Sequence, residues 1–219
     1  MNFEQMEKIK MTDRVKALRD MLFDKMPQIE SDRARLLTES YRQTENMPVI
    51  KRRSAAFSHI LRNIPITIRD GELIVGSTTI RPRSCQTFPE YSFEWLESEF
   101  DTVEHRSADP FYISDDAKEV LRKANSYWKG KTNSDLATSF MSEEALRAID
   151  HNIFTTGNYF YNGVGHLCVQ YDKVLKIGYS GIIDEAKEAL KKVDVSDSDA
   201  MERTSFLEAV IESCEAAIE

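Results

Sequence analysis

A glycine-rich stretch in the last third of the chain carries the residues best suited to chemistry. His166 directly follows Gly163-Val164-Gly165 and precedes an apolar stretch. An imidazole can give or take a proton near neutral pH, so a histidine placed in this way is a candidate general acid or base. Asn158 lies eight residues earlier, and its amide both donates and accepts hydrogen bonds, which suits a hydroxyl group of a ligand. We therefore expect a polar site for a small hydroxylated molecule.

Both residues also have structural interpretations. His166 can equally be a hydrogen-bonded histidine of the core, and Asn158 can occupy a left-handed turn beside Gly157. Cys168 is the only possible metal ligand two or four residues from His166, so we expect no metal and in particular no zinc. A thiolate pair of Cys168 and His166 is not expected either, because residues two apart on a strand share a face without forming a nucleophile–base geometry by default.

The remaining histidines and the one basic cluster indicate structure rather than function. We expect His59, His105 and His151 to be structural or surface residues, with His151 suited to the negative end of the preceding helix. Lys51-Arg52-Arg53 is interpreted as the solvated first turn of an amphipathic helix, because phosphate binding needs a broad positive field. A formal net charge of −8 also argues against a nucleic-acid partner.

Composition narrows the class of protein further. The chain has 219 residues, and its hydrophobic fraction of 41% is slightly below the usual share of about 45–50%. This hints at a core completed by other polypeptide. Three widely spaced cysteines indicate neither a disulfide framework nor a zinc site. We find no signal peptide and no apolar run of membrane-spanning length, so we expect a cytoplasmic protein without a membrane partner.

Helical periodicity dominates the pattern, and the expected fold is mainly α with a small β component (α+β). The β component is a hairpin, or a pair of short extended segments, formed by residues 66–69 and 73–76 around Asp70-Gly71. The expected helices begin near the caps Thr12, Ser31, Ser114 and Ser142 and cover the ranges 49–62, 90–100, 171–190 and the region after the polar gap 194–199. The last helix is still periodic at Glu219, which favours a chain cut inside an element over a domain that ends on a helix.

Five stretches together resemble the glycyl radical enzymes of the pyruvate formate-lyase superfamily, in order and in approximate spacing. The most specific is the run from Gly157 to His166, which is most similar to the cobalamin-independent propanediol and glycerol dehydratases. The others are residues 35–40, 70–76, 82–90 and 127–132. The resemblance covers nearly all of the chain and only the leading part of a family member. It therefore implies that residues 1–219 are the N-terminal part of a ten-stranded α/β barrel.

The resemblance also implies a reaction. In this family a glycyl radical of the protein, installed by a partner radical S-adenosylmethionine enzyme, passes to a cysteine, and the resulting thiyl abstracts hydrogen from the diol. No cobalamin is used, and we expect no cofactor to be bound by this chain. The residue that matches His166 protonates the departing hydroxyl, and the residue that matches Asn158 binds a substrate hydroxyl. We thus expect conversion of propane-1,2-diol to propionaldehyde, or of glycerol to 3-hydroxypropionaldehyde.

Two regions of the family pattern are missing from this sequence, and their absence affects the expected activity. The thiyl cysteine loop and the radical glycine region have no counterpart here, since Cys85, Cys168 and Cys214 do not fit the thiyl pattern. We therefore expect the chain to be inactive alone and to act with the remainder of a barrel, or as a homodimer in a full-length form. The alternatives are another glycyl radical lyase, such as a choline lyase or a formate acetyltransferase-like enzyme, and a non-catalytic fragment or scaffold.

Overall fold

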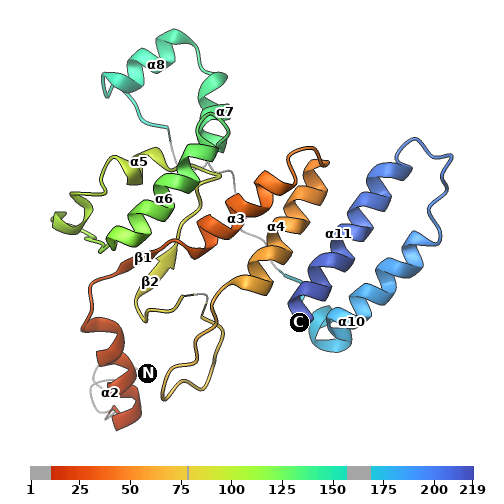
Figure 1. Ribbon diagram of the computed structural model, residues 1–219, viewed down its shortest axis with the longest axis horizontal. Coiled ribbons are helices and arrows are strands. Elements are labelled where there is room, and N and C mark those ends of the chain that lie inside the picture. Colours follow the sequence, from red (N-terminus) through yellow and green to blue (C-terminus); the bar gives the residue numbers. More distant parts are fainter. Residues whose placement is uncertain (1–10, 78, 157–168) are drawn as a thin grey trace, which may run out of the picture.

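The computed structural model describes residues 11–77, 79–156 and 169–219 of the chain. The described part is mainly helical, with one small two-stranded sheet, as the sequence predicts. Figure 1 shows α2 with the loop beside it, a central body around α3, α6 and the sheet, α7 and α8 above that body, and the α10–α11 pair, which packs on α4. The elements in chain order are α2 (Asp13–Phe23), β1 (Gln28–Glu30), α3 (Asp32–Gln43), α4 (Val49–Asn63), β2 (Ser84–Gln86), α5 (Glu94–Glu97), a 3-10 turn (Val103–His105), α6 (Asp115–Trp128), α7 (Asn133–Ser139), α8 (Glu143–Asp150), α10 (Tyr171–Leu190) and α11 (Ala200–Ile218).

Side-chain caps set the start of most predicted helices. The hydroxyls of Thr12, Ser114 and Ser142 each accept a hydrogen bond from the backbone three residues later, at the first turns of α2, α6 and α8. Thr132 caps α7 in a reciprocal arrangement with Asp135, which the sequence analysis does not include. Ser31 differs, because α3 begins after it as expected but its side chain makes no capping bond.

The two serines that precede α3 and α6 allow a matched test of capping. Ser114→Ala should lower the free energy of unfolding by about 0.5–2 kcal/mol, because it leaves an N–H group of the first turn of α6 without its acceptor. Ser31→Ala should have little effect, since no capping bond is lost. Urea unfolding followed by circular dichroism measures both; equal effects of the two substitutions would contradict the capping assignment.

The predicted hairpin of residues 66–76 does not form, and the structure is nearer to the alternative of short extended segments. Residues 66–76 contain no strand, and the pairing that the structure describes there is a single antiparallel bridge between Thr67 and Ser77. The sheet instead joins β1 and β2 in parallel, with Ile29 opposite Cys85. Side-chain contacts organise the segment instead: the backbone N–H of Arg69 donates to the Glu72 carboxylate, and the Arg69 guanidinium donates to oxygens of residues 77–81.

The helix predicted over residues 90–100 is also mostly wrong, because α5 covers four residues of it. The carbonyl groups of Glu90 and Tyr91 accept hydrogen bonds from the backbone N–H groups of Asn133 and Ser134, so the start of that range is tied to α7. Leu96 is buried as expected, whereas Trp95 is about half exposed rather than inward.

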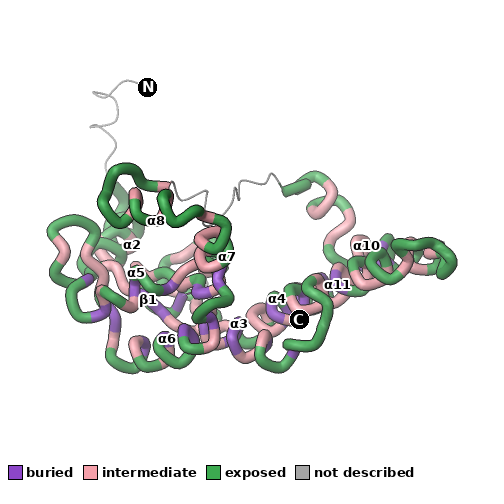
Figure 2. The backbone as a smooth tube through the Cα atoms, turned by 90° about the horizontal axis from the view of Figure 1, so that it is seen from above, coloured by how far each residue is buried: buried purple, intermediate pink, exposed green. Residues whose placement is uncertain are grey.

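The core lies in the central body and has two parts. Figure 2 shows buried residues gathered around β1, α3 and α6, while α2 and the far end of the α10–α11 pair are mostly exposed. The larger cluster joins Ile29, Phe100 and Leu121, and the smaller one joins Leu37 to Trp128. The core therefore positions the sheet and the segment after it, but it does not extend into α2.

Polar contacts along the length of α4 bind it to α11, and through α11 to the α10–α11 pair. Lys51 pairs with Glu208, and Arg62 donates to Glu219 at 3.1 Å. The buried Ser54 donates to Glu212 at 2.7 Å between them. Lys51 of the basic cluster thus lies in an ion pair, which agrees with its interpretation as the first turn of an amphipathic helix.

Candidate functional site

The predicted site residues Asn158 and His166 lie outside the residues that the structure describes. Their roles therefore stay predictions. The structure does place the segments on either side of them. On one side α8 ends at Asp150 and His151 follows as its C-cap; on the other side α10 begins at Tyr171. His151 is exposed, as expected for a surface histidine.

Three of the stretches that resemble glycyl radical enzymes meet in one junction beside the core. The indole of Trp128 donates to the Thr38 hydroxyl at 2.9 Å, which joins residues 127–132 to residues 35–40. The backbone N–H of Asn133, which directly follows residues 127–132, donates to the carbonyl of Glu90 at 3.0 Å. Residues 82–90 are thereby tied to the same place. Three stretches far apart in sequence thus form one packed structural junction.

Arg33 is the centre of this junction and is missed by the sequence analysis. Its guanidinium forms an ion pair with Glu90, donates to the Thr87 carbonyl at 3.0 Å and stacks over the Phe88 ring at 3.9 Å. Both charged side chains are mostly buried. The sequence offered one indication of this pair, Glu90 at the end of the stretch 82–90 that resembles the family. Arg33 lies 57 residues away, and no local pattern links the two residues. Because both terminal nitrogens of its guanidinium are bound to these partners, we assign Arg33 a structural role.

A second buried carboxylate holds the segment before β2. Glu30 is 3% exposed, and its oxygens accept hydrogen bonds from the backbone N–H groups of Ile80 at 3.0 Å and Arg81 at 2.8 Å. The Ser84 hydroxyl donates to the same carboxylate at 3.0 Å. These donors satisfy a charge that would otherwise be costly to bury. Glu30 therefore fixes β1 against the chain that leads into β2.

Replacing this carboxylate with an amide tests its role. Glu30→Gln should lower the free energy of unfolding by about 1–3 kcal/mol, because the amide NH₂ faces backbone donors and leaves one of them unsatisfied. Glu104→Gln is the matched control, since that carboxylate is exposed. Urea titrations of both variants measure the difference, and an unaltered midpoint for Glu30→Gln would contradict the assignment.

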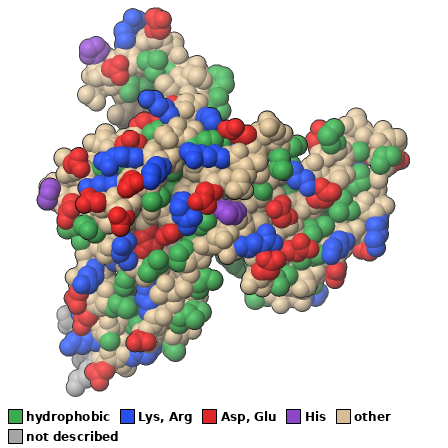
Figure 3. Space-filling view, viewed as in Figure 1, with side chains coloured by type: hydrophobic (Ala, Val, Ile, Leu, Met, Phe, Trp, Pro, Cys, Tyr) green, Lys and Arg blue, Asp and Glu red, His purple; other side chains and the backbone are tan. Residues whose placement is uncertain are grey.

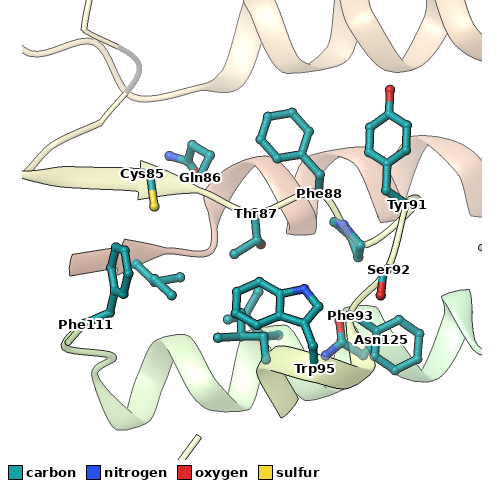
Figure 4. A pocket seen from close by; sticks show the side chains of 14 residues that line it. Cys85, Gln86, Thr87, Phe88, Tyr91, Ser92, Phe93, Trp95, Phe111 and Asn125 are labelled. Carbon is teal, nitrogen blue, oxygen red and sulfur yellow. The ribbon is translucent and has the colours of Figure 1, made fainter. Parts of the chain in front are cut away.

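A cavity of about 500 Å³ lies between β2, α5 and α6. Figure 4 shows its aromatic lining, which includes Phe88, Trp95 and Phe111. Cys85 also lines it, and burial, aided by the Glu30 carboxylate, raises the pKa of its thiol. The thiol is therefore protonated near neutral pH and is a poor nucleophile. The cavity can hold an apolar group but offers no acid–base pair among its lining residues.

The described ranges hold neither a cluster of metal ligands nor a membrane-spanning helix. Among residues 11–77, 79–156 and 169–219, no three His, Cys, Asp or Glu side chains come together as metal ligands. Within the same ranges, no helix is both long enough and apolar enough to cross a bilayer.

Comparison with known proteins identifies the family. The family model described as pyruvate formate lyase-like matches residues 10–219, so the chain belongs to the pyruvate formate lyase-like family. Its homologues and structural neighbours are glycyl radical enzymes, as the resemblance predicts.

Individual relatives include several dehydratases. The (2S)-3-sulfopropanediol dehydratase of Klebsiella oxytoca is 34% identical over 93% of this chain and 25% of its own length. A solved structure concerning 1,2-propanediol dehydration in Roseburia inulinivorans is 56% identical, with a TM-score of 0.87 over 95% of this chain and 25% of that one. The glycerol-bound B12-independent glycerol dehydratase of Clostridium butyricum is 52% identical, with a TM-score of 0.88 over 96% of this chain and 27% of that one. The chain thus spans about a quarter of the length of these relatives.

Proposed function

We propose that this chain provides the diol-recognising part of a cobalamin-independent glycyl radical dehydratase acting on propane-1,2-diol or glycerol. The observation that carries the proposal is the level of identity. The chain is 56% and 52% identical to structures associated with 1,2-propanediol and glycerol dehydration, against 34% for the relative that acts on sulfopropanediol. This difference favours a small uncharged vicinal diol as substrate.

In this proposal His166 is the catalytic acid and Asn158 binds a substrate hydroxyl. Hydroxide is a poor leaving group, so a proton delivered to it as it departs lowers the barrier, typically by a factor of about 10²–10⁴. Asn158 fixes the diol through donor and acceptor groups of its amide. The overall reaction removes one water from the diol and leaves an aldehyde. The family's protein-based radical abstracts the hydrogen atom, and Asn158 and His166 take no part in that step.

The proposal requires partners. Residues 1–219 are taken as the part of a pyruvate formate-lyase-type domain that carries the substrate loop, completed by the remaining barrel polypeptide or by assembly of a full-length form. A radical S-adenosylmethionine enzyme installs the glycyl radical. We place this reaction in the cytoplasm, where oxygen-free conditions preserve the radical, with a bacterial microcompartment as a further compatible location.

Co-expression tests the proposal. The chain would be produced under anaerobic conditions with the part of the Clostridium butyricum glycerol dehydratase that it does not match and with that enzyme's activating enzyme. We expect aldehyde formation that depends on propane-1,2-diol or glycerol. Trimethylamine formed from choline would favour a choline lyase, acetyl transfer from pyruvate would favour a formate acetyltransferase-like enzyme, and no turnover of any substrate would favour a non-catalytic scaffold.

A further inference from the structure

The helix α10 contains a sharp kink at Gly178. The backbone angles of this residue, φ 63° and ψ −178°, are non-helical, so two helical parts meet there. This pair of angles is adopted almost only by glycine, and backbone outliers of this kind gather at functional sites. Figure 1 shows the start of α10 turned away from the axis of the rest of the helix. We call residues 171–177 the arm and residues 179–190 the main segment of α10.

Two contacts show that the arm folds back over the main segment. A Cβ added at Gly181 would lie 2.6 Å from the Cβ of Ile177, whereas Cβ atoms four residues apart in a regular helix are about 5–6 Å apart. Lys173 forms an ion pair with Glu185, although a straight helix would separate residues twelve positions apart by about 18 Å. Gly181 therefore gives Ile177 room, and glycines on both sides of the contact build the kink.

The ion pair across the kink does not hold it alone. Its Lys173 and Glu185 side chains are 36% and 56% exposed, and Figure 3 shows basic and acidic side chains interspersed over the α10–α11 pair. Exposed ion pairs of this kind contribute little to stability. The backbone conformation of Gly178 is therefore the main determinant of the direction of the arm.

The two parts of α10 differ in how they are anchored. The buried residues of this helix are Ile183 and Ala186, and both follow the kink. Leu175 of the arm is 86% exposed. Because α10 packs on α11 and α11 packs on α4, the main segment is a fixed base from which the arm extends. The place of the start of the arm thus depends on the backbone at residue 178.

The arm leads directly to the stretch that carries His166. His166 lies five residues before Tyr171, where α10 begins, so the length of the chain keeps the two residues within about 17 Å of each other. The arm is about 10 Å long, and a change in its direction would displace its start by a comparable distance. An error of about 1 Å in the place of a catalytic group can lower a rate about 10²-fold. The direction of the arm therefore bears strongly on a reaction that needs His166.

We propose that Gly178 is a positioning residue of the dehydration reaction, because its backbone conformation sets the direction of the arm and thereby the place of His166. The inference rests on the proposed function, in which His166 is the catalytic acid. Gly178 acts through the arm and not by contact with the substrate. The requirement is specific for glycine, since an L-amino acid with a side chain would be strained at these backbone angles.

Gly178→Ala tests this role in the chain assembled with the complementary part of the Clostridium butyricum glycerol dehydratase and the activating enzyme. Nothing lies within 4 Å of the added Cβ, so the substitution changes the backbone preference without a clash. The measurement is the anaerobic rate of aldehyde formation divided by the glycyl radical content, read by electron paramagnetic resonance. We expect this ratio to fall at least about tenfold. A mere loss of folded enzyme would lower rate and radical content together and leave the ratio unchanged.

Gly130→Ala is the matched control. Gly130 also has a positive φ, 76°, and open space around its Cβ position, but it follows α6 rather than the arm. Its replacement introduces comparable backbone strain and should leave the ratio of rate to radical content unchanged. Gly181→Ala is a second variant of the kink that acts through a different cause, since its Cβ would displace Ile177. It should lower the ratio as Gly178→Ala does, and it carries the test if Gly178→Ala prevents assembly.

A distance measurement shows whether the arm has moved. Leu175 in the arm and Val195 beyond the end of α10 are 86% and 93% exposed, so both positions tolerate a spin label attached to a genetically encoded ketone residue. Double electron–electron resonance then gives the distance between the two labels. Gly178→Ala should lengthen this distance, because an unkinked helix carries the arm away from the main segment, and Gly130→Ala should not change it.

The possible results separate this inference from the proposed function. If the original chain forms aldehyde and Gly178→Ala is no slower per radical than Gly130→Ala, the inference is overturned and the proposed function stands. A slower Gly178→Ala enzyme with an unaltered label distance also overturns the inference, because Gly178 would then act without moving the arm. No turnover of any diol by the original chain would refute the proposed function, and the positioning role would fall with it.

Discussion

Replacing His166 with alanine should reduce diol turnover by the assembled enzyme about 10²–10⁴-fold, the range expected for loss of a general acid. The hydroxyl that leaves would then depart as hydroxide without a proton donor. The measurement is the anaerobic rate of aldehyde formation by the chain co-expressed with the complementary polypeptide and the activating enzyme. The glycyl radical signal, read by electron paramagnetic resonance, should keep its intensity, because His166 is not assigned to radical storage.

His151 provides the matched control for this experiment. It is an exposed histidine at the C-terminal end of α8. His151→Ala removes an imidazole of the same size and should leave turnover unchanged. If His166→Ala retained full turnover, or if both variants lost activity equally, His166 would have no specific part in the mechanism.

The largest loss of stability should come from Trp128. This side chain is 4% exposed, donates its indole N–H to Thr38 and packs against the rings of Tyr41 and Tyr127 at centroid distances of 5.0 and 5.3 Å. Trp128→Ala should lower the free energy of unfolding by about 3–5 kcal/mol, because it leaves a cavity and removes the indole donor from the Thr38 hydroxyl, which keeps only its bond to the Ala34 carbonyl. Urea unfolding followed by circular dichroism measures the loss.

Trp95, the other tryptophan of the chain, is the control for size and residue type. It is 51% exposed, so Trp95→Ala should cost much less than Trp128→Ala. A loss at Trp95 as large as that at Trp128 would show that α5 contributes more to the core than its contacts indicate.

The helices were the most predictable part of the fold, because their signals are local. Thr12, Ser114 and Ser142 each place a hydroxyl where the first turn needs an acceptor, and all three caps form. The long range 171–190 has sustained helical periodicity and becomes α10, despite the kink at Gly178. Local side-chain chemistry and periodicity are sufficient at these positions.

The sheet could not be predicted in the same way. β1 and β2 pair in parallel across more than fifty residues, so no turn sequence marks their pairing. The pattern of residues 66–76 satisfied the local rules for a hairpin, but Arg69 organises that segment through contacts with residues 77–81. A tertiary contact thus overrides local propensity.

The same contrast between local signals and long-range contacts applies to the functional residues. Gly163, Gly165 and His166 lie close together in sequence, so their motif can be recognised without a structure. It contributed to the family resemblance, which the comparisons confirm. Arg33, Glu30 and Glu90 were not identified, because each acts through partners about fifty residues away. The junction around α3 and β2 depends on such long-range pairs, and a single sequence carries no direct signal for them.

The central claim is that Asn158 and His166 hold a vicinal diol, and a crystal structure of the assembled protein with propane-1,2-diol bound tests it most directly. The account predicts an imidazole nitrogen of His166 roughly 2.6–3.2 Å from the hydroxyl oxygen that departs, with the Asn158 amide bonded to a hydroxyl of the same molecule. A diol held by other residues, with the His166 side chain in solvent and away from it, would contradict the account.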